Sequence, residues 1–212
     1  VIGGGSFGTV IANITAENGY EVSFWMRSES KAEQLNRTRE NSQYLPNYQL
    51  NERVVATSDM AAAVKDSSLI FVAVPSSSFR QVVRDMVPHL AQSTVLVSTT
   101  KGIESGSFDL MTQILHQEAP NAKVGVLSGP NLAVEIAKKN LTGTVIASPD
   151  EQVRELVKSA LKSTYFRVYA NNDMFGVELG GSLKNIYAII AGIATALGMG
   201  HNTNSMLVTR AL

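Results

Sequence analysis

Apolar and polar positions alternate in short blocks along most of the chain, and the blocks predict strands and helices in turn. The clearest strand is the unbroken apolar run at residues 69–74, which Pro75 ends. Such a run is typical of a parallel strand that is covered on both faces. Because strand-like and helix-like blocks alternate throughout, the pattern predicts an α/β protein with a doubly wound sheet and helices on both faces.

The predicted elements follow one another at regular intervals. Strands are expected at residues 20–26, 54–57, 69–74, 95–97, 124–127, 144–147 and 166–169. Helices are expected at residues 9–18, 31–39, 59–65, 79–90, 107–118, 133–139 and 153–162. Gly19 is placed to end the first helix, and Asp59 is placed to cap the third.

The pattern changes after Ala170, because the rest of the chain reads as helix only. Residues 171–173 read as a turn and a helix start. We therefore expect one domain over residues 1–170 and the first part of an all-helical domain over residues 171–212. Since the chain opens at the end of a strand pattern and closes inside a helical one, we expect it to be a fragment.

Composition excludes several classes of protein. Hydrophobic residues make up 44% of the chain and charged residues 17%, which excludes intrinsic disorder. The 18 Lys and Arg balance the 18 Asp and Glu, so no basic excess indicates a nucleic-acid partner. The chain has no cysteine, which excludes thiol catalysis and Cys-type zinc sites. No apolar stretch reaches the ~18 residues of a membrane helix, so no membrane insertion is expected.

The segment GGGSFG at residues 3–8 matches the pattern G-x-G-x-x-G between a strand remnant and a helix. Gly3 permits a tight turn, Gly5 lets a pyrophosphate approach the backbone, and Gly8 lets the helix pack closely. The following helix offers unpaired N–H groups to phosphates. This context favours dinucleotide binding, and a plain glycine-rich turn is the alternative.

The second predicted strand ends at Arg27. NAD-selective sites usually carry an acidic residue at this point, where it binds the ribose hydroxyls. A cation can instead pair with a 2′-phosphate or stack on adenine. Arg27 therefore favours NADP(H) or the use of both nucleotides, and an ordinary exposed arginine is the alternative.

Two lysines are candidates for chemistry. Lys101 follows a predicted strand, at the sheet edge where ligands bind. Lys184 follows Gly180 and Gly181, which each cost a helix about 1 kcal/mol and so indicate that a ligand or another helix approaches the backbone closely. Because the helix is apolar, we expect Lys184 to be partly desolvated. Desolvation and a neighbouring cation both lower a lysine pKa, and such a lysine can exchange a proton with a substrate hydroxyl. The alternatives are a loop charge and a surface lysine.

The segments GGGSFGT, VAVPS, TKGIE, LSGPNLAVE, FRVY and ELGGSLKN, in this order and spacing, resemble bacterial NAD(P)-dependent glycerol-3-phosphate dehydrogenase. The resemblance covers nearly the whole chain. It implies a Rossmann-like domain that binds NADP or NAD, and a helical substrate domain. It also implies interconversion of glycerol 3-phosphate and dihydroxyacetone phosphate for phospholipid synthesis. A cytoplasmic homodimer with a small phosphorylated substrate and no metal is the corresponding expectation.

The resemblance also implies roles for single residues. It implies cofactor contacts from Gly3, Gly5, Ser6, Phe7, Gly8, Arg27, Pro75, Lys101 and Ala133, and substrate contacts from Lys101, Gly129, Asn131 and Lys184. Lys184 matches the proton-transfer lysine, and Lys101 matches the lysine between substrate and cofactor. Phe7 stands where members usually carry Trp, and Asn131 stands where many carry Ser or Thr.

Two other functions fit parts of the same pattern. Another hydroxyacid dehydrogenase of the 6-phosphogluconate dehydrogenase-like superfamily would also place a lysine at the start of its helical domain. The segments GGSLKN and TKGIE favour the glycerol phosphate enzyme. A non-catalytic nucleotide-sensing module would bind the cofactor without turnover, and the presence of both lysines argues against it.

Overall fold

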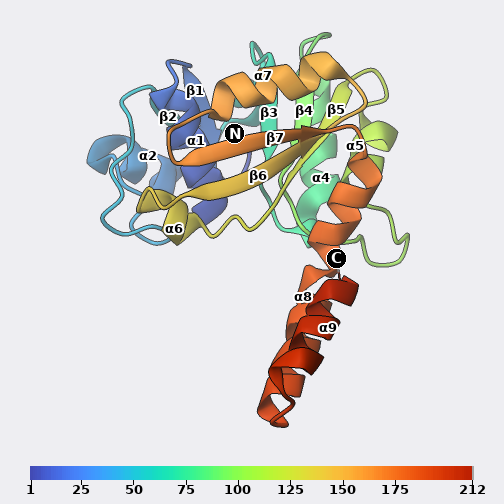
Figure 1. The fold of residues 1–212 in the computed structure, drawn as a ribbon. Coiled ribbons are helices and arrows are strands. Elements are labelled where there is room, and N and C mark those ends of the chain that lie inside the picture. Colours follow the sequence, from blue (N-terminus) through green and yellow to red (C-terminus); the bar gives the residue numbers. More distant parts are fainter. Residues whose placement is uncertain (212) are drawn as a thin grey trace.

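The computed structural model describes residues 1–211 as an α/β body from which a helical hairpin projects (Figure 1). The strands are β1 (Val22–Trp25), β2 (Val54–Thr57), β3 (Leu69–Val72), β4 (Val95–Ser98), β5 (Lys123–Ser128), β6 (Thr142–Ala147) and β7 (Phe166–Asn171). The helices are α1 (Ser6–Glu17), α2 (Glu29–Thr38), α3 (Met60–Val64), α4 (Ser76–Met86), α5 (Met111–Glu118), α6 (Ala133–Ala137), α7 (Glu151–Leu161), α8 (Met174–Ala196) and α9 (His201–Ala211). A 3₁₀ turn, η1 (Val87–His89), follows α4.

Ile2 joins the strands into one sheet, because it bridges Trp25 of β1 on one side and Val72 of β3 on the other. The strand order is therefore β2-β1-Ile2-β3-β4-β5-β6-β7. Neighbours run parallel except for β5 and β6, which are antiparallel. The chain turns from one half of the sheet to the other at Ile2, and this switch point is where doubly wound sheets bind ligands. The predicted doubly wound sheet is confirmed.

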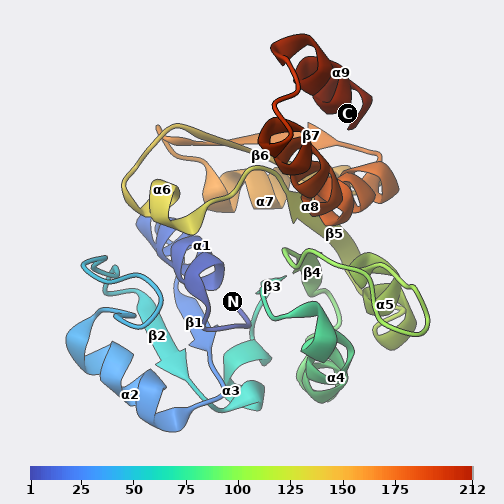
Figure 2. The same cartoon turned by 90° about the horizontal axis from the view of Figure 1, so that it is seen from below.

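Helices cover the sheet on both sides (Figures 1 and 2). Helices α1, α6 and α7 pack together on one face, and α3, α4 and α5 pack on the other. Alternate residues of a strand point to opposite faces. In β3, Ile70 belongs to one apolar core and Phe71 to the other, and both are at most 2% exposed. The central strands are thus buried on both sides, as their continuous apolar runs predicted.

One predicted helix begins later than expected. The pattern placed a helix over residues 107–118, but α5 begins at Met111. Phe108 has φ 63°, in the left-handed region, which a helix does not allow. The Glu104 N–H donates to the Asp109 carbonyl at 2.9 Å and closes this segment into a loop. The sequence interval before Met111 is therefore part of the loop that follows β4.

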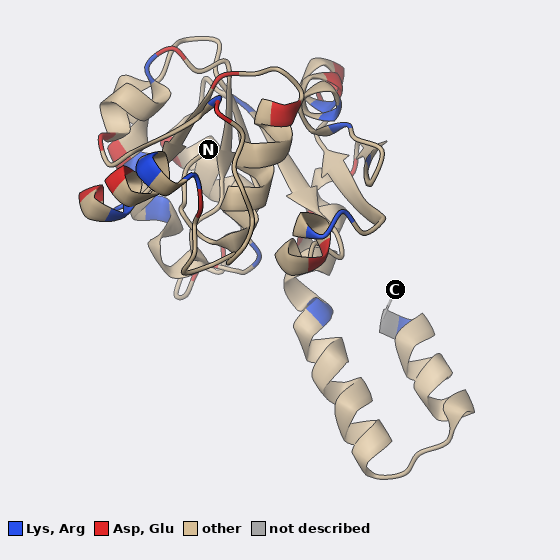
Figure 3. Ribbon diagram, turned by 90° about the vertical axis from the view of Figure 1, so that its left-hand side faces the viewer, with Lys and Arg blue, Asp and Glu red and all other residues tan. Residues whose placement is uncertain are grey.

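The chain leaves the sheet at Asn171 and enters α8 through a capped turn. The Asp173 carboxylate accepts the Gly176 N–H at 2.8 Å, which confirms the predicted helix start. Figure 3 shows that α8 and α9 form a hairpin on which few residues carry charge. Several large apolar side chains lie exposed along α8, with Ile189 at 64%. Among residues 1–211, no helix combines the length and apolarity that crossing a bilayer requires.

Candidate functional site

A cleft of ≈ 780 Å³ opens at the carboxyl edge of the sheet, beside Ile2. Its walls are the glycine-rich turn, the end of β1 and the segments that follow β3 and β4. Of the predicted cofactor residues, the cleft is lined by Gly3, Gly5, Phe7, Gly8, Arg27, Pro75 and Lys101. Ser6 and Ala133 do not line it. The Ser6 hydroxyl donates to the Tyr44 carbonyl at 3.2 Å, and Ala133 is the first residue of α6.

The glycines of the turn meet different constraints. Gly3 has φ +123°, and a Cβ at this position would collide with the Ala73 carbonyl. A Cβ on Gly8 would collide with the carbonyl of Gly3. A Cβ on Gly5, in contrast, would meet nothing within 4 Å. The fold therefore requires glycine at two positions, whereas Gly5 leaves open space against the backbone, as a pyrophosphate needs.

The N-terminus of α1 faces this space. Gly5 is the N-cap, and no side chain among residues 1–211 caps the helix. The exposed N–H groups and the positive end of the helix dipole suit an anion. Asn41 supports the turn, because its Nδ2 donates to the Gly4 carbonyl at 3.0 Å and to Thr9 Oγ1 at 2.8 Å. The sequence pattern did not identify Asn41, which belongs to an irregular loop.

Two cations lie where β1 meets α2. Arg27 is exposed and lines the cleft, and so does Lys31. Ser28 caps α2 with its hydroxyl, which accepts the Lys31 N–H at 3.4 Å. The N-terminus of α1 thus provides positive charge for an anion at the glycine-rich turn. Arg27 and Lys31 provide it at the far end of the cleft, where β1 meets α2. Lys31 was missed in the sequence, although its spacing of four residues from Arg27 was a usable signal.

Lys101 links the cleft to the end of β5. Its side chain is half-buried, and Nζ donates to the Gly129 carbonyl at 2.9 Å. Burial lowers the pKa of the Lys101 ammonium, and the neighbouring charge of Lys184 lowers it further. The structure thus brings together Lys101, Gly129 and Lys184 from three separate segments. Lys184 itself is exposed, so the expectation that it is partly desolvated is wrong for the described chain.

The segment after β5 is held tightly. A Cβ on Gly129 would lie 3.0 Å from the Gly143 carbonyl, so the backbone after β5 approaches β6 closely here. Asn131 Nδ2 donates to Thr144 Oγ1 at 3.0 Å. The Asn131 Oδ1 atom is buried and has no hydrogen-bond partner among residues 1–211. This leaves a buried acceptor close to the segment that Lys101 contacts.

The two adjacent glycines of α8 differ in their surroundings. A Cβ on Gly181 would collide with the Ser128 hydroxyl, so Gly181 permits α8 to pack against the end of β5. A Cβ on Gly180 would meet nothing within 4 Å. A close approach therefore occurs at Gly181, but its partner is the end of β5, whereas a ligand or another helix was expected.

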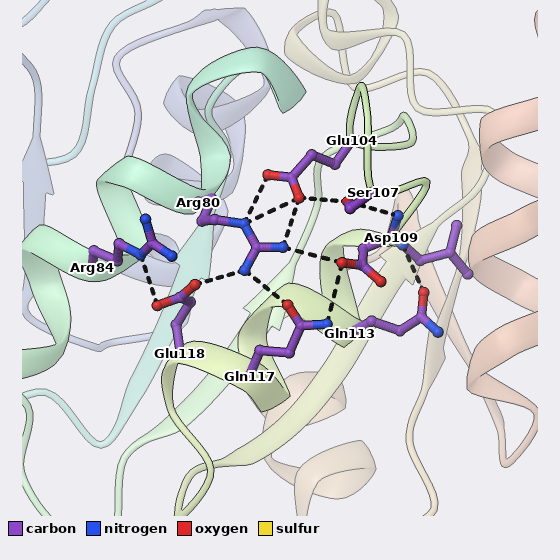
Figure 4. Close-up of polar contacts among 9 residues, drawn as sticks. Arg80, Arg84, Glu104, Ser107, Asp109, Gln113, Gln117 and Glu118 are labelled. Carbon is purple, nitrogen blue, oxygen red and sulfur yellow. Dashed lines mark hydrogen bonds and ion pairs between the residues drawn. The ribbon is translucent and has the colours of Figure 1, made fainter.

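Arg80 of α4 holds the loop that carries Lys101 (Figure 4). Its guanidinium contacts Glu104 through Nε at 2.8 Å and Nη2 at 2.6 Å. The same guanidinium contacts Asp109 at 3.1 Å and Glu118 at 2.6 Å. Glu104 and Asp109 lie on the loop, and Glu118 ends α5. Arg80 therefore ties the Lys101 loop to two helices, a network that the sequence pattern did not reveal.

This network changes the acidity of its members. Hydrogen bonds from Arg80 and Ser107, helped by the charge of Arg80, lower the pKa of Glu104 from 4.5 to about 2. The pKa of Glu118 is lowered by Arg84 and Arg80. Glu104 and Glu118 are therefore ionised at neutral pH. In the described range 1–211, no three His, Asp or Glu side chains gather in a way that could hold a metal ion.

The fold and the cleft define a dinucleotide-binding protein of the Rossmann type, with a pair of lysines beside the cleft. The N-terminal model of the NAD-dependent glycerol-3-phosphate dehydrogenases matches residues 1–154, and the C-terminal model matches residues 173–212. The chain belongs to the NAD-dependent glycerol-3-phosphate dehydrogenase family. The resemblance drawn from the sequence motifs is confirmed, and with it the expected class of cofactor, NAD or NADP.

Similar proteins carry the corresponding names. The chain is 56% identical over 212 residues to glycerol-3-phosphate dehydrogenase [NAD(P)+] of Pseudomonas syringae pv. tomato, and 53% identical to that of Teredinibacter turnerae. All of this chain is covered, and 62% of each relative, so the chain spans about three fifths of their length. A crystal structure of glycerol-3-phosphate dehydrogenase from Coxiella burnetii superposes with a TM-score of 0.90 at 36% identity, over 99% of this chain and 64% of that one.

The open space beside Gly5 gives a first prediction. Gly5 has φ −80°, which any residue adopts, so Gly5→Val should lower the unfolding temperature much less than a change at Gly8 does. The valine side chain would fill the phosphate space and lower NADPH affinity by roughly tenfold or more, ~1.4 kcal/mol. Isothermal titration calorimetry measures this. Gly8→Ala is the contrast, because its collision should lower the unfolding temperature as well. Unchanged affinity in Gly5→Val would contradict the placement of the pyrophosphate.

The Arg80 network gives a second prediction. Since the folded-state pKa of Glu104 is depressed, its contribution to stability is present above pH 4.5 and is lost as the pH falls towards about 2. Glu104→Gln should lower the urea midpoint at neutral pH and flatten this acid-side decline. Glu33→Gln, at an exposed site on α2, is the control and should follow the wild type. Equal acid-side declines in the wild type and Glu104→Gln would refute the assignment.

Proposed function

We propose that the full-length protein interconverts dihydroxyacetone phosphate and sn-glycerol 3-phosphate with NADPH or NADH. The observation that carries this proposal is the pair of lysines at the edge of a dinucleotide cleft. Lys101, on the loop after β4, lines the cleft, and Lys184 of α8 lies close enough to lower the pKa of Lys101. The names of relatives that are more than 50% identical support the same reaction.

The side chains present can donate the proton that such a reaction needs and can stabilise the negative charge that develops in it. The bound reduced nicotinamide would supply a hydride to the substrate carbonyl carbon. Lys184 donates a proton to the carbonyl oxygen as it becomes an alcohol, and in the reverse direction it takes the proton back. Lys101 places positive charge beside that oxygen and stabilises the negative charge that develops there. The Gly129 carbonyl uses one donor of the Lys101 ammonium, which leaves others for substrate oxygens.

The segment after β5 supports a substrate that carries a hydroxyl group. Asn131 Oδ1 is a buried acceptor without a partner among residues 1–211. A buried acceptor of this kind costs free energy until a donor reaches it. In this proposal the Asn131 side chain turns towards the bound substrate, and the free hydroxyl of dihydroxyacetone phosphate is such a donor. In this proposal, Gly129 and Asn131 hold the end of the substrate that lies away from its phosphate.

The cations at the far end of the cleft support NADPH as the preferred reductant. A Rossmann site that selects NAD offers an acidic residue to the ribose hydroxyls, whereas Arg27 and Lys31 offer two positive charges. An arginine also matches the geometry of a phosphate group. In this proposal both side chains bind the 2′-phosphate, while Ser6, Phe7, Pro75 and Ala133 contribute to the rest of the cofactor site.

Three further properties complete the proposal. The reaction runs mainly towards glycerol 3-phosphate and supplies phospholipid synthesis, the enzyme works in the cytoplasm, and it forms a homodimer. These properties rest on the family to which the chain belongs.

The proton-transfer role gives a third prediction. Lys184→Ala should lower kcat for dihydroxyacetone phosphate reduction by roughly 10²- to 10⁴-fold, the usual contribution of general acid–base catalysis. Because Lys184 does not line the cofactor cleft, the Kd for NADPH should stay nearly constant. Lys65→Ala, at an exposed lysine next to α3, is the control and should match the wild type in both measurements. Substantial residual turnover in Lys184→Ala would exclude this role.

Cofactor selection gives a fourth prediction. Arg27→Asp should lower the ratio of kcat/KM for NADPH to that for NADH by about tenfold or more, since it replaces attraction to the 2′-phosphate with repulsion. Lys31→Ala should change the ratio in the same direction. Arg37→Asp is a charge-matched control, because Arg37 is exposed in the last turn of α2 and does not line the cleft. If Arg27→Asp and Arg37→Asp give the same ratio of kcat/KM for the two cofactors, Arg27 does not bind the 2′-phosphate.

A further inference from the structure

A buried carboxylate joins α8 to α5. Glu178, near the start of α8, is only 2% exposed. One of its carboxylate oxygens accepts the backbone N–H of Thr112 at 3.0 Å, and the other accepts the Thr112 hydroxyl. Burial raises the pKa of Glu178, and the hydrogen bonds from Thr112 oppose that rise. Burying a carboxylate costs free energy unless hydrogen bonds compensate it, so this contact requires a reason.

The contact is a helix cap supplied from another helix. Thr112 lies in the first turn of α5, where backbone N–H groups have no partner within the helix. The N-cap residue, Leu110, has no side-chain acceptor of its own. The Glu178 carboxylate provides that acceptor and meets the positive end of the helix dipole. The position of α8 is thereby tied to the helix that follows the Lys101 loop.

Two further contacts fix α8 one turn after this cap. Ser182 lies one turn after Glu178, and its hydroxyl accepts the N–H of Gly102 at 3.2 Å. Gly102 is the residue next to Lys101. On the same face of the helix, Gly181 packs against Ser128 at the end of β5. Lys184 follows Gly181 by three residues, and its charge lies close enough to Lys101 to lower the pKa of that lysine.

We propose that Glu178 is a positioning residue that sets α8 so that Lys184 stands beside Lys101. The inference rests on the proposed function, in which both lysines act on the substrate oxygen. Glu178 does not touch the cofactor cleft, and it acts through the helix that carries Lys184. Its effect should therefore fall on kcat, because a displacement of ~1 Å at a reacting group costs about 100-fold.

Two buried threonines provide a matched comparison, which is the fifth prediction. Thr112 and Thr94 are 3% and 2% exposed, and each hydroxyl donates one hydrogen bond. Thr94 bonds the Ser67 carbonyl, before β4, away from α8. Thr112→Val should lower kcat by roughly 10- to 100-fold. Thr94→Val should lower the unfolding temperature comparably and leave kcat within about twofold of the wild type, a change of less than ~0.5 kcal/mol. The Kd for NADPH should not change in either variant.

Variants of Glu178 grade the effect. Glu178→Ala removes both acceptors and should lower kcat more than Thr112→Val does. Glu178→Gln keeps one carbonyl oxygen for the Thr112 N–H, so it should restore part of the lost kcat. If Glu178→Ala is too unstable to purify, the comparison of Glu178→Gln and Thr112→Val with Thr94→Val still decides the question. Equal kcat in Thr112→Val and Thr94→Val would overturn the proposal.

A measurement without turnover separates this inference from the proposed function. A short reagent that bridges two amines should cross-link Lys101 to Lys184 in the full-length wild type, as detected by peptide mass spectrometry. The yield should fall in Thr112→Val and Glu178→Gln, and it should persist in Thr94→Val. The same yield in all four proteins would refute the positioning role even if dihydroxyacetone phosphate is reduced. A selective loss of yield would support it even if another substrate is used.

Discussion

The site depends on holding two ammonium groups close together at the carboxyl edge of a parallel sheet. Lys101 comes from the loop after β4 and Lys184 from α8, and the like charge of Lys184 adds to burial in lowering the pKa of Lys101. The surrounding structure must therefore hold both lysines in place. The Gly129 carbonyl fixes the Lys101 ammonium, and the Arg80 network fixes the loop behind it. The cap that Glu178 places on α5 fixes the helix that carries Lys184.

The two ligands of the proposed reaction are served by different parts of the chain. The cofactor cleft lies beside Ile2 and is formed by the glycine-rich turn and the neighbouring strand ends. All residues that line it belong to the α/β body. The proposed proton donor comes instead from α8. The substrate carbonyl would therefore bind where body and helical hairpin meet. A small change in how α8 packs would alter the chemistry while leaving the cofactor cleft as it is.

The sequence predicted the sheet well because buried parallel strands are continuous apolar runs. The glycine motif was equally informative, since the turn leaves no room for a Cβ at Gly3 and Gly8. Contacts between distant polar residues were beyond such reasoning. Arg80 lies 24 residues from Glu104, and Glu178 lies 66 residues from Thr112. No local sequence pattern indicates that these side chains are in contact. The prediction of a helix before Met111 was wrong for a related reason. The left-handed backbone of Phe108 is set by the loop that the Glu104–Asp109 hydrogen bond closes.

The most direct test of the account is the stoichiometry and labelling of one reaction. The full-length protein would be given dihydroxyacetone phosphate and NADPH carrying deuterium at C4 of the nicotinamide, and the products would be analysed by mass spectrometry and NMR. The account predicts one molecule of glycerol 3-phosphate for each NADPH oxidised, with deuterium at carbon 2. Tight NADPH binding without oxidation, or oxidation only with a different carbonyl substrate, would contradict it.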